Sequence, residues 1–281
     1  MPPSAQEGRP PYARRKDEGA QEVRPEEGPQ GSAVHQTVVI PSRRLDWPDC
    51  RNIRDLGGLP LSGGFTRSGV LVRSDNLHSL NSAGVEAMAA YGVTTVIDLR
   101  SESEAASSPS PFANAEPFAA SAPTYTNLPL IDDASMVKLA KASDMFERYL
   151  MMLEYRAAAF GEIFSTLANS EGTVVFHCFA GKDRTGMVAA MSLALAGVDA
   201  DSIAADYAET DSQMATRYAE WLAAAKPELL QEMRDDLRCP PERIHGILEH
   251  LERGWGGVEG YLEAAGMPAN DISNLRSKLI S

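Results

Sequence analysis

Cysteine is scarce in this sequence: its 281 residues include only Cys50, Cys178 and Cys239. Three cysteines at unrelated spacings are typical neither of a disulfide framework nor of a zinc site. Structural disulfides occur mainly in oxidising compartments, so a sequence without their pattern favours a reducing setting. We therefore expect a cytoplasmic protein, and the sequence leaves secretion by a non-classical route open.

Long apolar runs and positive charge are also lacking. No run approaches the ~18 apolar residues of a membrane-spanning helix, and no apolar stretch follows the basic residues near the N-terminus, which argues against a Sec-type signal peptide. The chain has 26 Lys and Arg against 39 Asp and Glu, a formal charge of −13. This balance argues against nucleic acid as a partner and against stable membrane association.

The N-terminal segment is poor in large apolar side chains and rich in proline, glycine and charge. Such a segment cannot bury enough surface to offset the entropy lost on ordering. We predict a disordered tail over residues 1–33 and one folded domain over 34–281, which begins with an edge strand at 34–40.

The domain is organised around a stretch that joins an apolar run to a helix-compatible run. Residues 173–176 are β-branched or aromatic, which predicts a buried strand. Residues 187–196 are rich in Ala, Leu, Met and Val, and Gly197 follows as a stop, which predicts a buried helix. A tight turn between them would aim successive N–H groups at one point, at the positive end of the helix dipole. The sequence therefore predicts an anion cradle that contains Cys178.

Cys178 and Arg184 carry the chemistry of this cradle. Only a thiolate is a strong nucleophile, and the amide donors, the helix N-terminus and Arg184 would all favour the anion. The planar guanidinium of Arg184 can donate to two phosphate oxygens at once, whereas the ammonium of a lysine cannot form this bidentate contact. We expect Lys182 to add a second positive charge at the rim, and the Thr185 hydroxyl to donate to the sulfur when an intermediate breaks down.

Three further residues shape the predicted loop. His177, at the strand end, would hold the loop by hydrogen bonding and bias the cysteine toward its anion. Gly181 and Gly186 would let the loop curl and the helix pack closely.

Strands and helices alternate in the middle of the chain. We predict strands at 70–72, 93–99 and 124–130, a hairpin-like turn at 61–65, a helix from 81 or 82 to about 91, and one long helical region at 143–168. After Gly197 we expect only helices, at 201–210, 211–225, 227–237, 240–253, 258–265 and 270–280. This order predicts an α/β fold with a central, mostly parallel sheet flanked by helices and a helical C-terminal third.

The loop sequence His-Cys-Phe-Ala-Gly-Lys-Asp-Arg-Thr-Gly at 177–186 resembles the signature of cysteine-dependent protein tyrosine phosphatases. Its particular form is similar to a bacterial subgroup, the mycobacterial secreted phosphatase B type and its Listeria lipid-phosphatase relatives. Four companion segments support the resemblance, at 52–58, 73–75, 97–100 and 257–262. Together they span roughly 46–280 and imply a protein-tyrosine-phosphatase-like fold. A Cys-x5-Arg pattern alone would be weak evidence for the family, whereas the full loop sequence together with four companion segments is specific evidence.

The resemblance implies a two-step hydrolysis. The Cys178 thiolate attacks phosphorus to form a phosphocysteine, and water then hydrolyses it while Arg184 and the loop amides stabilise the equatorial oxygens. The substrate-binding residues implied are Phe179, Ala180, Gly181, Lys182, Thr185 and Gly186. The cradle supplies the positive field, so neither metal nor other cofactor is expected.

The general acid has two candidates in this sequence. Asp183 lies inside the loop, and Asp132 resembles the acid loop of the family in position. A positive cradle would lower the pKa of an acid, so the pattern leaves both candidates open. We prefer Asp132 as the acid and Asp183 as an organiser of the loop and its water. The segment Trp47-Pro48-Asp49 imitates the acid loop of the larger eukaryotic enzymes but lies far upstream. We interpret it as a hydrophobic contact by Trp47 and a turn at Asp49.

Charged residues of the companion segments are expected behind the loop rather than against substrate. We predict that Arg54, Asp55, Asp98 and Arg100 form buried ion pairs that fix its geometry. The interval between Asp132 and Cys178 is shorter than in the mycobacterial relatives, so only residues 134–146 could cover the pocket. We therefore expect a more open site.

The expected substrate is phosphotyrosine in a protein or peptide. Phosphoserine, phosphothreonine and phosphoinositides are alternatives, as is a non-catalytic module that keeps the cradle for phosphate recognition. Retention of Cys178, Arg184 and Thr185 together with both candidate acids favours an enzyme, since binding alone needs no acid.

Overall fold

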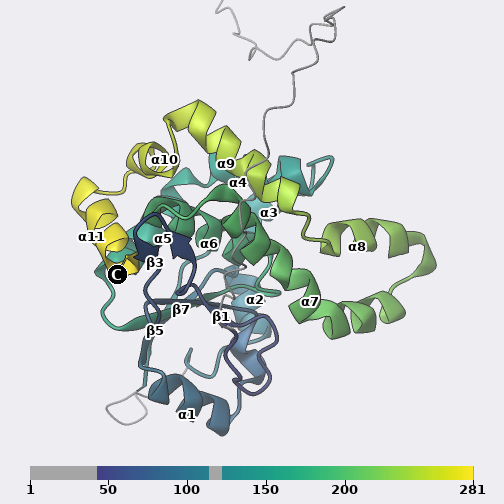
Figure 1. Ribbon diagram of the computed structural model, residues 1–281. Coiled ribbons are helices and arrows are strands. Elements are labelled where there is room, and N and C mark those ends of the chain that lie inside the picture. Colours follow the sequence, from purple (N-terminus) through teal and green to yellow (C-terminus); the bar gives the residue numbers. More distant parts are fainter. Residues whose placement is uncertain (1–42, 114–121, 281) are drawn as a thin grey trace, which may run out of the picture. The chain divides into compact units, whose positions relative to one another are not determined.

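The computed structural model describes residues 43–113 and 122–280 (Figure 1). The tail predicted at 1–33 and the edge strand predicted at 34–40 lie outside these ranges.

A five-stranded sheet forms the centre, with the strand order β1-β4-β7-β5-β6. Strands β4, β7, β5 and β6 run parallel to one another, and β1 pairs antiparallel with β4. The bounds are β1 Arg54–Asp55, β4 Leu71–Ser74, β7 Thr173–His177, β5 Val93–Asp98 and β6 Thr124–Asn127. The expected α/β class with a mostly parallel central sheet is confirmed.

The strand register brings the ends of three strands together. His177 at the end of β7 is in register with Ser74 of β4 on one side and with Asp98 of β5 on the other. The segments that follow these strands therefore leave the sheet at the same edge, as expected for the ligand side of a parallel sheet.

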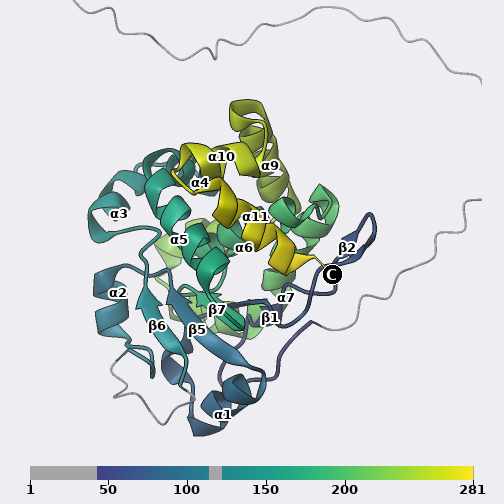
Figure 2. The same cartoon turned by 90° about the vertical axis from the view of Figure 1, so that its left-hand side faces the viewer.

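The sheet separates two hydrophobic cores because successive side chains of a strand point to opposite faces. Val174 and Phe176 of β7 pack in the larger core with residues of α4, α5 and α6. Val175 packs in the smaller core with Trp47 and with Met88 of α1. Figure 2 shows α1 on one side of the sheet, with α5 and α6 on the other. All five residues of β7 are buried, which explains its continuous apolar run.

The helices preceding β7 are α1 Ser82–Ala90, α2 Glu102–Ser107, α3 Asp133–Leu139, α4 Met145–Tyr155 and α5 Ala157–Asn169, with a 3-10 turn η1 at Leu77–Ser79. Asn81 caps α1 by accepting a hydrogen bond from Gly84 N, as its position predicts. Strands β2 (Pro60–Leu61) and β3 (Gly64–Phe65) form the predicted hairpin.

After β7 the described chain is helical. The elements are α6 Asp183–Ala196, α7 Ala200–Ala224, the 3-10 turn η2 Pro227–Leu229, α8 Leu230–Leu237, α9 Pro241–Trp255, α10 Val258–Ala264 and α11 Ala269–Leu279. Gly197 ends α6 in the left-handed conformation that the stop signal predicts. The helical C-terminal third is confirmed.

Three predicted boundaries are wrong. The single region at 143–168 is two helices, α4 and α5, because Arg156 leaves helical geometry between them and its guanidinium binds the carbonyls of Leu130 and Pro129. The helices predicted at 201–210 and 211–225 are one continuous helix, α7, since Thr210 is buried and Asp211 does not interrupt it. The strand predicted at 124–130 ends at Asn127, just before Pro129 would remove a ladder donor. Among the described helices, none is long and apolar enough to cross a membrane.

Candidate active site

The loop between β7 and α6 has its backbone carbonyls held from outside. Each carbonyl from Cys178 to Gly181 accepts a hydrogen bond from a group that lies beyond the loop or beside it. The donors are His177 Nδ1 to Cys178 O (3.2 Å), Asn76 N to Phe179 O (3.1 Å), Asn52 Nδ2 to Ala180 O and Gly181 O (both 3.0 Å) and Arg73 Nη2 to Gly181 O (2.7 Å). With the carbonyls turned outward, the N–H groups of the same peptides turn toward the loop interior.

Those N–H groups are available to an anion. Within residues 43–113 and 122–280, the N–H groups of residues 179–185 donate no hydrogen bond to another protein group. The last of them belong to the first turn of α6, where the helix dipole adds partial positive charge. We call this loop, residues 178–184 with the N–H groups at its centre, the cradle; Cys178 lies within it and is 3% exposed.

Gly181 is required by the curl of this loop. Its φ of +65° lies in the left-handed region, and a Cβ atom there would stand 2.7 Å from Ser74 O and 2.8 Å from Asp75 N. The loop thus packs against the end of β4 too closely for any other residue.

Arg184 is fixed by a carboxylate from another element. Glu104 of α2 accepts two hydrogen bonds from the Arg184 guanidinium: Nη1 lies 2.5 Å from Oε2, and Nη2 lies 2.9 Å from Oε1. Although burial alone would lower the pKa of Arg184, the hydrogen bonds and charge of Glu104 raise it above its ordinary range. The same pair outweighs burial for Glu104 and lowers its pKa, so both groups are charged. The guanidinium is thereby held rigid beside the cradle.

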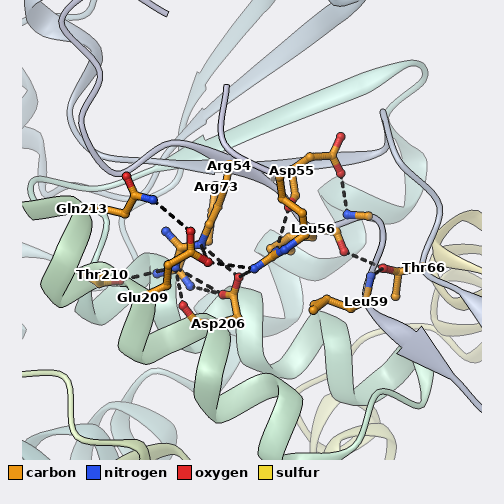
Figure 3. A network of polar contacts seen from close by, with 12 residues as sticks. Arg54, Asp55, Leu56, Leu59, Thr66, Arg73, Asp206, Glu209, Thr210 and Gln213 are labelled. Carbon is orange, nitrogen blue, oxygen red and sulfur yellow. Dashed lines mark hydrogen bonds and ion pairs between the residues drawn. The ribbon is translucent and has the colours of Figure 1, made fainter. Parts of the chain in front are cut away.

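A buried cluster supports the loop from behind (Figure 3). Asp206 of α7 binds Arg73 Nη1 at 2.6 Å, Arg54 Nε at 3.0 Å and Arg43 Nη2 at 2.7 Å. Arg54 was expected in an ion pair, and its partner is Asp206. The expectation that Asp55 forms an ion pair is wrong: its oxygens accept from Gly57 N, Gly69 N and the Tyr91 hydroxyl instead.

Asp98 and Arg100 pair with each other at the end of β5. Arg100 Nη2 lies 2.6 Å from Asp98 Oδ2, and Arg100 Nε lies 2.9 Å from Oδ1. Asp98 Oδ2 also lies 3.8 Å from His177 Nε2. Burial lowers the pKa of His177, although Asp98 opposes this. His177 is thus neutral and fully buried at ordinary pH, and it acts on the loop through its position.

Comparisons with known proteins show the family of this chain. A model described as the tyrosine phosphatase family matches residues 45–281. The chain belongs to that family. A tyrosine-protein phosphatase from Nostoc commune is 32% identical over 226 residues, which cover 74% of this chain and 73% of the relative. The triple specificity protein phosphatase PtpB of Mycobacterium tuberculosis is 29% identical over 280 residues, covering 83% of this chain and 98% of the relative.

The two candidate acids of this phosphatase occupy different environments. Asp132 is the N-cap of α3: its Oδ1 accepts from Ser135 N at 2.7 Å, and its Oδ2 lies 2.5 Å from Arg156 Nη1. The hydrogen bond from Ser135, assisted by Arg156, lowers the pKa of Asp132, whose side chain is 42% exposed. Asp132 therefore holds two structural contacts and favours its ionised form.

Asp183 begins α6 and faces the same space as Arg184. Its Oδ1 accepts from the Tyr149 hydroxyl and lies 3.2 Å from Lys182 Nζ. A cavity of about 200 Å³ contains both Asp183 and Arg184 in its wall. Its other lining residues are Ile131, Met136, Leu139, Ala140, Met145, Arg148 and Met152. The segment 134–146 that the sequence offers as a cover therefore forms one side of this cavity.

Lys182 is not at the rim. Only 4% of it is exposed, and its ammonium donates to the carbonyl of Asp236 in α8 and lies beside Asp183. Lys182 therefore connects the loop to α8, and its positive charge is buried beside Asp183.

Of the other loop residues that the sequence predicts in the site, Thr185 is buried, Gly186 packs against a neighbouring helix and Phe179 is exposed. The Thr185 hydroxyl is buried and has no hydrogen-bond partner among the described residues, which leaves it free for a group in the cradle. A Cβ at Gly186 would lie 3.0 Å from the Tyr207 ring, so the glycine allows α6 and α7 to pack closely. Phe179 is 47% exposed and stacks on Trp221 at 5.7 Å between ring centroids.

The segment Trp47-Pro48-Asp49 is structural, as expected. Trp47 is buried with its ring edge-on to Tyr91, at 5.9 Å between centroids. Asp49 lies in a turn with a φ of 63°.

Sequence reasoning missed four residues that shape the site: Asn52, Glu104, Tyr149 and Asp206. Glu104 carried a usable signal, because Ser101-x-x-Glu104 is a capping-box pattern directly after β5, and the box forms. Asn52 lies within a companion segment of the resemblance. Tyr149 and Asp206 are single polar residues in amphipathic helices, so their importance arises only when distant segments meet.

Proposed function

We propose that this phosphatase hydrolyses phosphotyrosine in protein substrates through a phosphocysteine intermediate. The observation that carries the proposal is the cradle: a buried thiol surrounded by unpaired N–H groups and a guanidinium fixed by Glu104. Such a site stabilises the equatorial oxygens of a phosphoryl group in transfer, where preorganised donors contribute most.

In the proposed first step the Cys178 thiolate forms a bond from Sγ to phosphorus, and the bond from phosphorus to the tyrosyl oxygen breaks. That oxygen takes a proton from an acid and leaves as a phenol. In the second step water attacks phosphorus, the S–P bond breaks and inorganic phosphate departs. The Thr185 hydroxyl can donate to the departing sulfur, since it has no other partner among the described residues.

We propose Asp183 as the acid. It lines the cavity together with Arg184, whereas Asp132 is occupied as a helix cap and by Arg156. In the second step the resulting Asp183 carboxylate would accept a proton from the attacking water. If the assignment is right, Asp183→Asn abolishes the basic limb of the kcat/KM profile, and Asp132→Asn keeps it. The opposite result would assign the role to Asp132.

The apolar wall of the cavity supports an aromatic substrate. Ile131, Met136, Leu139, Met145 and Met152 offer side chains that suit the ring of phosphotyrosine. These residues would favour phosphotyrosine over the shorter phosphoserine and phosphothreonine, which present no ring to the wall.

One observation favours a second candidate, a phosphoinositide. Arg148 lines the same cavity as Arg184, and its Nε is buried without a partner among the described residues. A second cation there could receive a second phosphate. Rates compared on phosphotyrosyl, phosphoseryl and phosphothreonyl peptides and on phosphoinositides decide between these classes, and Arg148→Gln should reduce only the phosphoinositide rate.

The decisive test of the mechanism uses Cys178→Ser. We expect it to abolish vanadate-sensitive turnover of p-nitrophenyl phosphate while binding of a phosphotyrosyl peptide survives. Acid quenching of the unmutated enzyme with labelled substrate should trap label on the protein, and Cys178→Ser should trap none. Absence of vanadate-sensitive turnover in the unmutated enzyme would instead leave a phosphate-binding module as the better account.

A further inference from the structure

We propose that a buried pair of tyrosines, Tyr149 and Tyr207, positions Asp183 so that its Oδ2 carries the proton given to the leaving group. This inference rests on the proposed role of Asp183 as general acid. Among the described residues, the two tyrosine hydroxyls hydrogen-bond to Asp183, Arg243 and each other and not to Cys178 or the cradle N–H groups, so their role would be one of positioning.

Four helices contribute one group each to a continuous chain of hydrogen bonds. Arg243 of α9 donates from Nη1 to the Tyr207 hydroxyl of α7 at 3.0 Å. The Tyr207 and Tyr149 oxygens lie 2.9 Å apart, and the Tyr149 hydroxyl of α4 reaches Asp183 Oδ1 at the start of α6. Both tyrosines are fully buried.

The direction of the hydrogen bonds follows from the arginine. A guanidinium can only donate, so the Tyr207 oxygen is an acceptor toward Arg243. If the Tyr207 O–H donates to Tyr149 and the Tyr149 O–H donates to Asp183, every hydrogen has an acceptor. In the reverse direction, the Tyr207 hydrogen has no acceptor among the described residues, and a buried unpaired hydroxyl is costly. The chain therefore runs from Arg243 to Asp183.

This direction distinguishes the two oxygens of Asp183. Oδ1 accepts from Tyr149 and also lies 3.2 Å from the Lys182 ammonium. An oxygen that faces two donors is the poorer place for a proton, so the acidic proton resides on Oδ2. Because Asp183 lines the cavity that holds Arg184, an immobilised Oδ1 leaves Oδ2 as the oxygen available to substrate.

The tyrosines themselves do not titrate in the working range. Burial, followed by the charge of Asp183, raises the pKa of Tyr149 well above its ordinary value. Burial likewise raises the pKa of Tyr207. The other charged or titratable groups that face Asp183 from the surrounding elements are Lys182, Arg184, Tyr218, Cys239, Arg243 and, across the cavity, Arg148.

Removing the Tyr149 hydroxyl should therefore change proton transfer in a specific way. Without this donor, Asp183 Oδ1 loses the hydrogen bond that holds it in place. Oδ1 also becomes able to hold the proton, in a position from which it cannot be delivered. The rate should fall for leaving groups that need a proton and stay nearly constant for those that do not.

The experiment measures kcat/KM of the full chain on phenyl phosphate and on 2,4-dinitrophenyl phosphate, with Tyr149→Phe. We expect a fall of about 10- to 100-fold on phenyl phosphate, a fraction of the usual general-acid contribution, and little change on the dinitrophenyl ester. The ratio of the two rates therefore reports the position of the proton on Asp183. Equal losses on both substrates would overturn the inference, as would no loss.

Two further variants secure this test. Tyr207→Phe, which leaves the Tyr149 hydroxyl in place, should give a smaller effect of the same sign, and it carries the test alone if Tyr149→Phe does not fold. Tyr261 is an equally buried tyrosine whose hydroxyl donates to Leu153 O at 2.8 Å. Tyr261→Phe should leave the ratio of the two rates unchanged, which controls for the loss of a buried hydroxyl as such.

Asp183→Asn separates failure of this inference from failure of the proposed acid. If Asp183→Asn lowers the phenyl phosphate rate selectively and Tyr149→Phe does not, the acid stands and the tyrosine chain is only structural. If Asp183→Asn affects both substrates equally, Asp183 is not the acid and the inference falls with it.

Discussion

The Asp206 carboxylate lies 2.6 Å from the Arg73 guanidinium, and neither side chain reaches solvent (Figure 3). The other end of the same guanidinium donates to Gly181 O at 2.7 Å. A residue of α7 thereby fixes the position of a carbonyl in the cysteine loop. The loop depends on this helix as much as on the strand and helix that flank it in sequence.

Replacing Asp206 with Asn should destabilise the protein strongly. Its carboxylate also binds Arg43 and Arg54, so the change leaves three arginines without their shared counter-charge. Breaking a buried ion pair on one side typically costs about 3–5 kcal/mol. Urea unfolding measures the difference. The exposed pair of Glu259 with Arg276 provides the control, since Glu259→Gln should cost less than about 1 kcal/mol. Similar costs for both variants would show that the cluster adds little.

The ionisation of the Asp206 carboxylate should make the free energy of unfolding depend on pH. Burial alone would raise the pKa of Asp206, but Arg54, Arg73 and Arg43 lower it far below its ordinary range. Its contribution to stability is therefore complete above the unfolded value of about 3.9 and is lost progressively as pH falls below that value. At pH 3 the unmutated protein should take up almost one proton more on unfolding than Asp206→Asn does. Proton uptake measured in urea tests this, and equal uptake would contradict it.

How much of this site was readable from the sequence depended on the distance between partners. Cys178, Arg184 and the adjoining strand and helix are contiguous, so their residue types alone predicted a strand, a tight turn and a helix at the positions of β7 and α6. Asp206 lies 152 positions from Arg54, and nothing in α7 marks it as the partner. Only the packing of α7 against the sheet creates the pair.

Local signals also misled where a tertiary contact outweighed them. The charge of Lys182 predicted an exposed position at the rim of the loop. The ammonium is instead buried, because it donates to the Asp236 carbonyl of α8. Asp55 follows an arginine, which suggested an ion pair, yet its oxygens serve the N–H groups of a turn. Composition near Arg156 favoured continuous helix, and the carbonyls of the segment before α3 broke it.

Gly181→Ala should damage both stability and turnover. The residue would occupy a left-handed backbone position at a cost of about 1–3 kcal/mol, and its methyl group would press on Ser74 O at 2.7 Å. Displacement of the loop by a fraction of an ångström should lower kcat/KM on p-nitrophenyl phosphate by up to about 100-fold.

Gly197→Ala separates these two causes. Gly197 also has a positive φ, of +90°, but a Cβ there meets no atom within 4 Å. It should therefore show the conformational cost in urea unfolding and retain its turnover. If Gly181→Ala turns over as fast as Gly197→Ala, the close approach to β4 does not set the loop geometry.

Glu104→Gln should weaken catalysis while leaving the fold intact. Glu104 has two tasks: it binds Arg184 in a bidentate pair, and its Oε2 accepts from Ser101 N at 3.0 Å to complete the cap of α2. Glutamine supports a capping box as glutamate does, so the cap should survive. The amide can accept only one of the two guanidinium hydrogen bonds and carries no charge, so Arg184 becomes free to leave its position beside the cradle.

We expect Glu104→Gln to lower kcat/KM on p-nitrophenyl phosphate by about 10- to 100-fold, as for loss of one preorganised group in a charged site. Inhibition by vanadate should weaken in parallel, since the same guanidinium would grip its oxygens. Glu102→Gln is the matched control, because Glu102 lies on the same short helix and is exposed. The free energy of unfolding should change by less than about 1 kcal/mol in Glu102→Gln, and in Glu104→Gln by less than in Asp206→Asn, because the Glu104 side chain is 25% exposed. Equal kinetics for the two variants would mean that Arg184 holds its position without Glu104, through the packing of α6 alone.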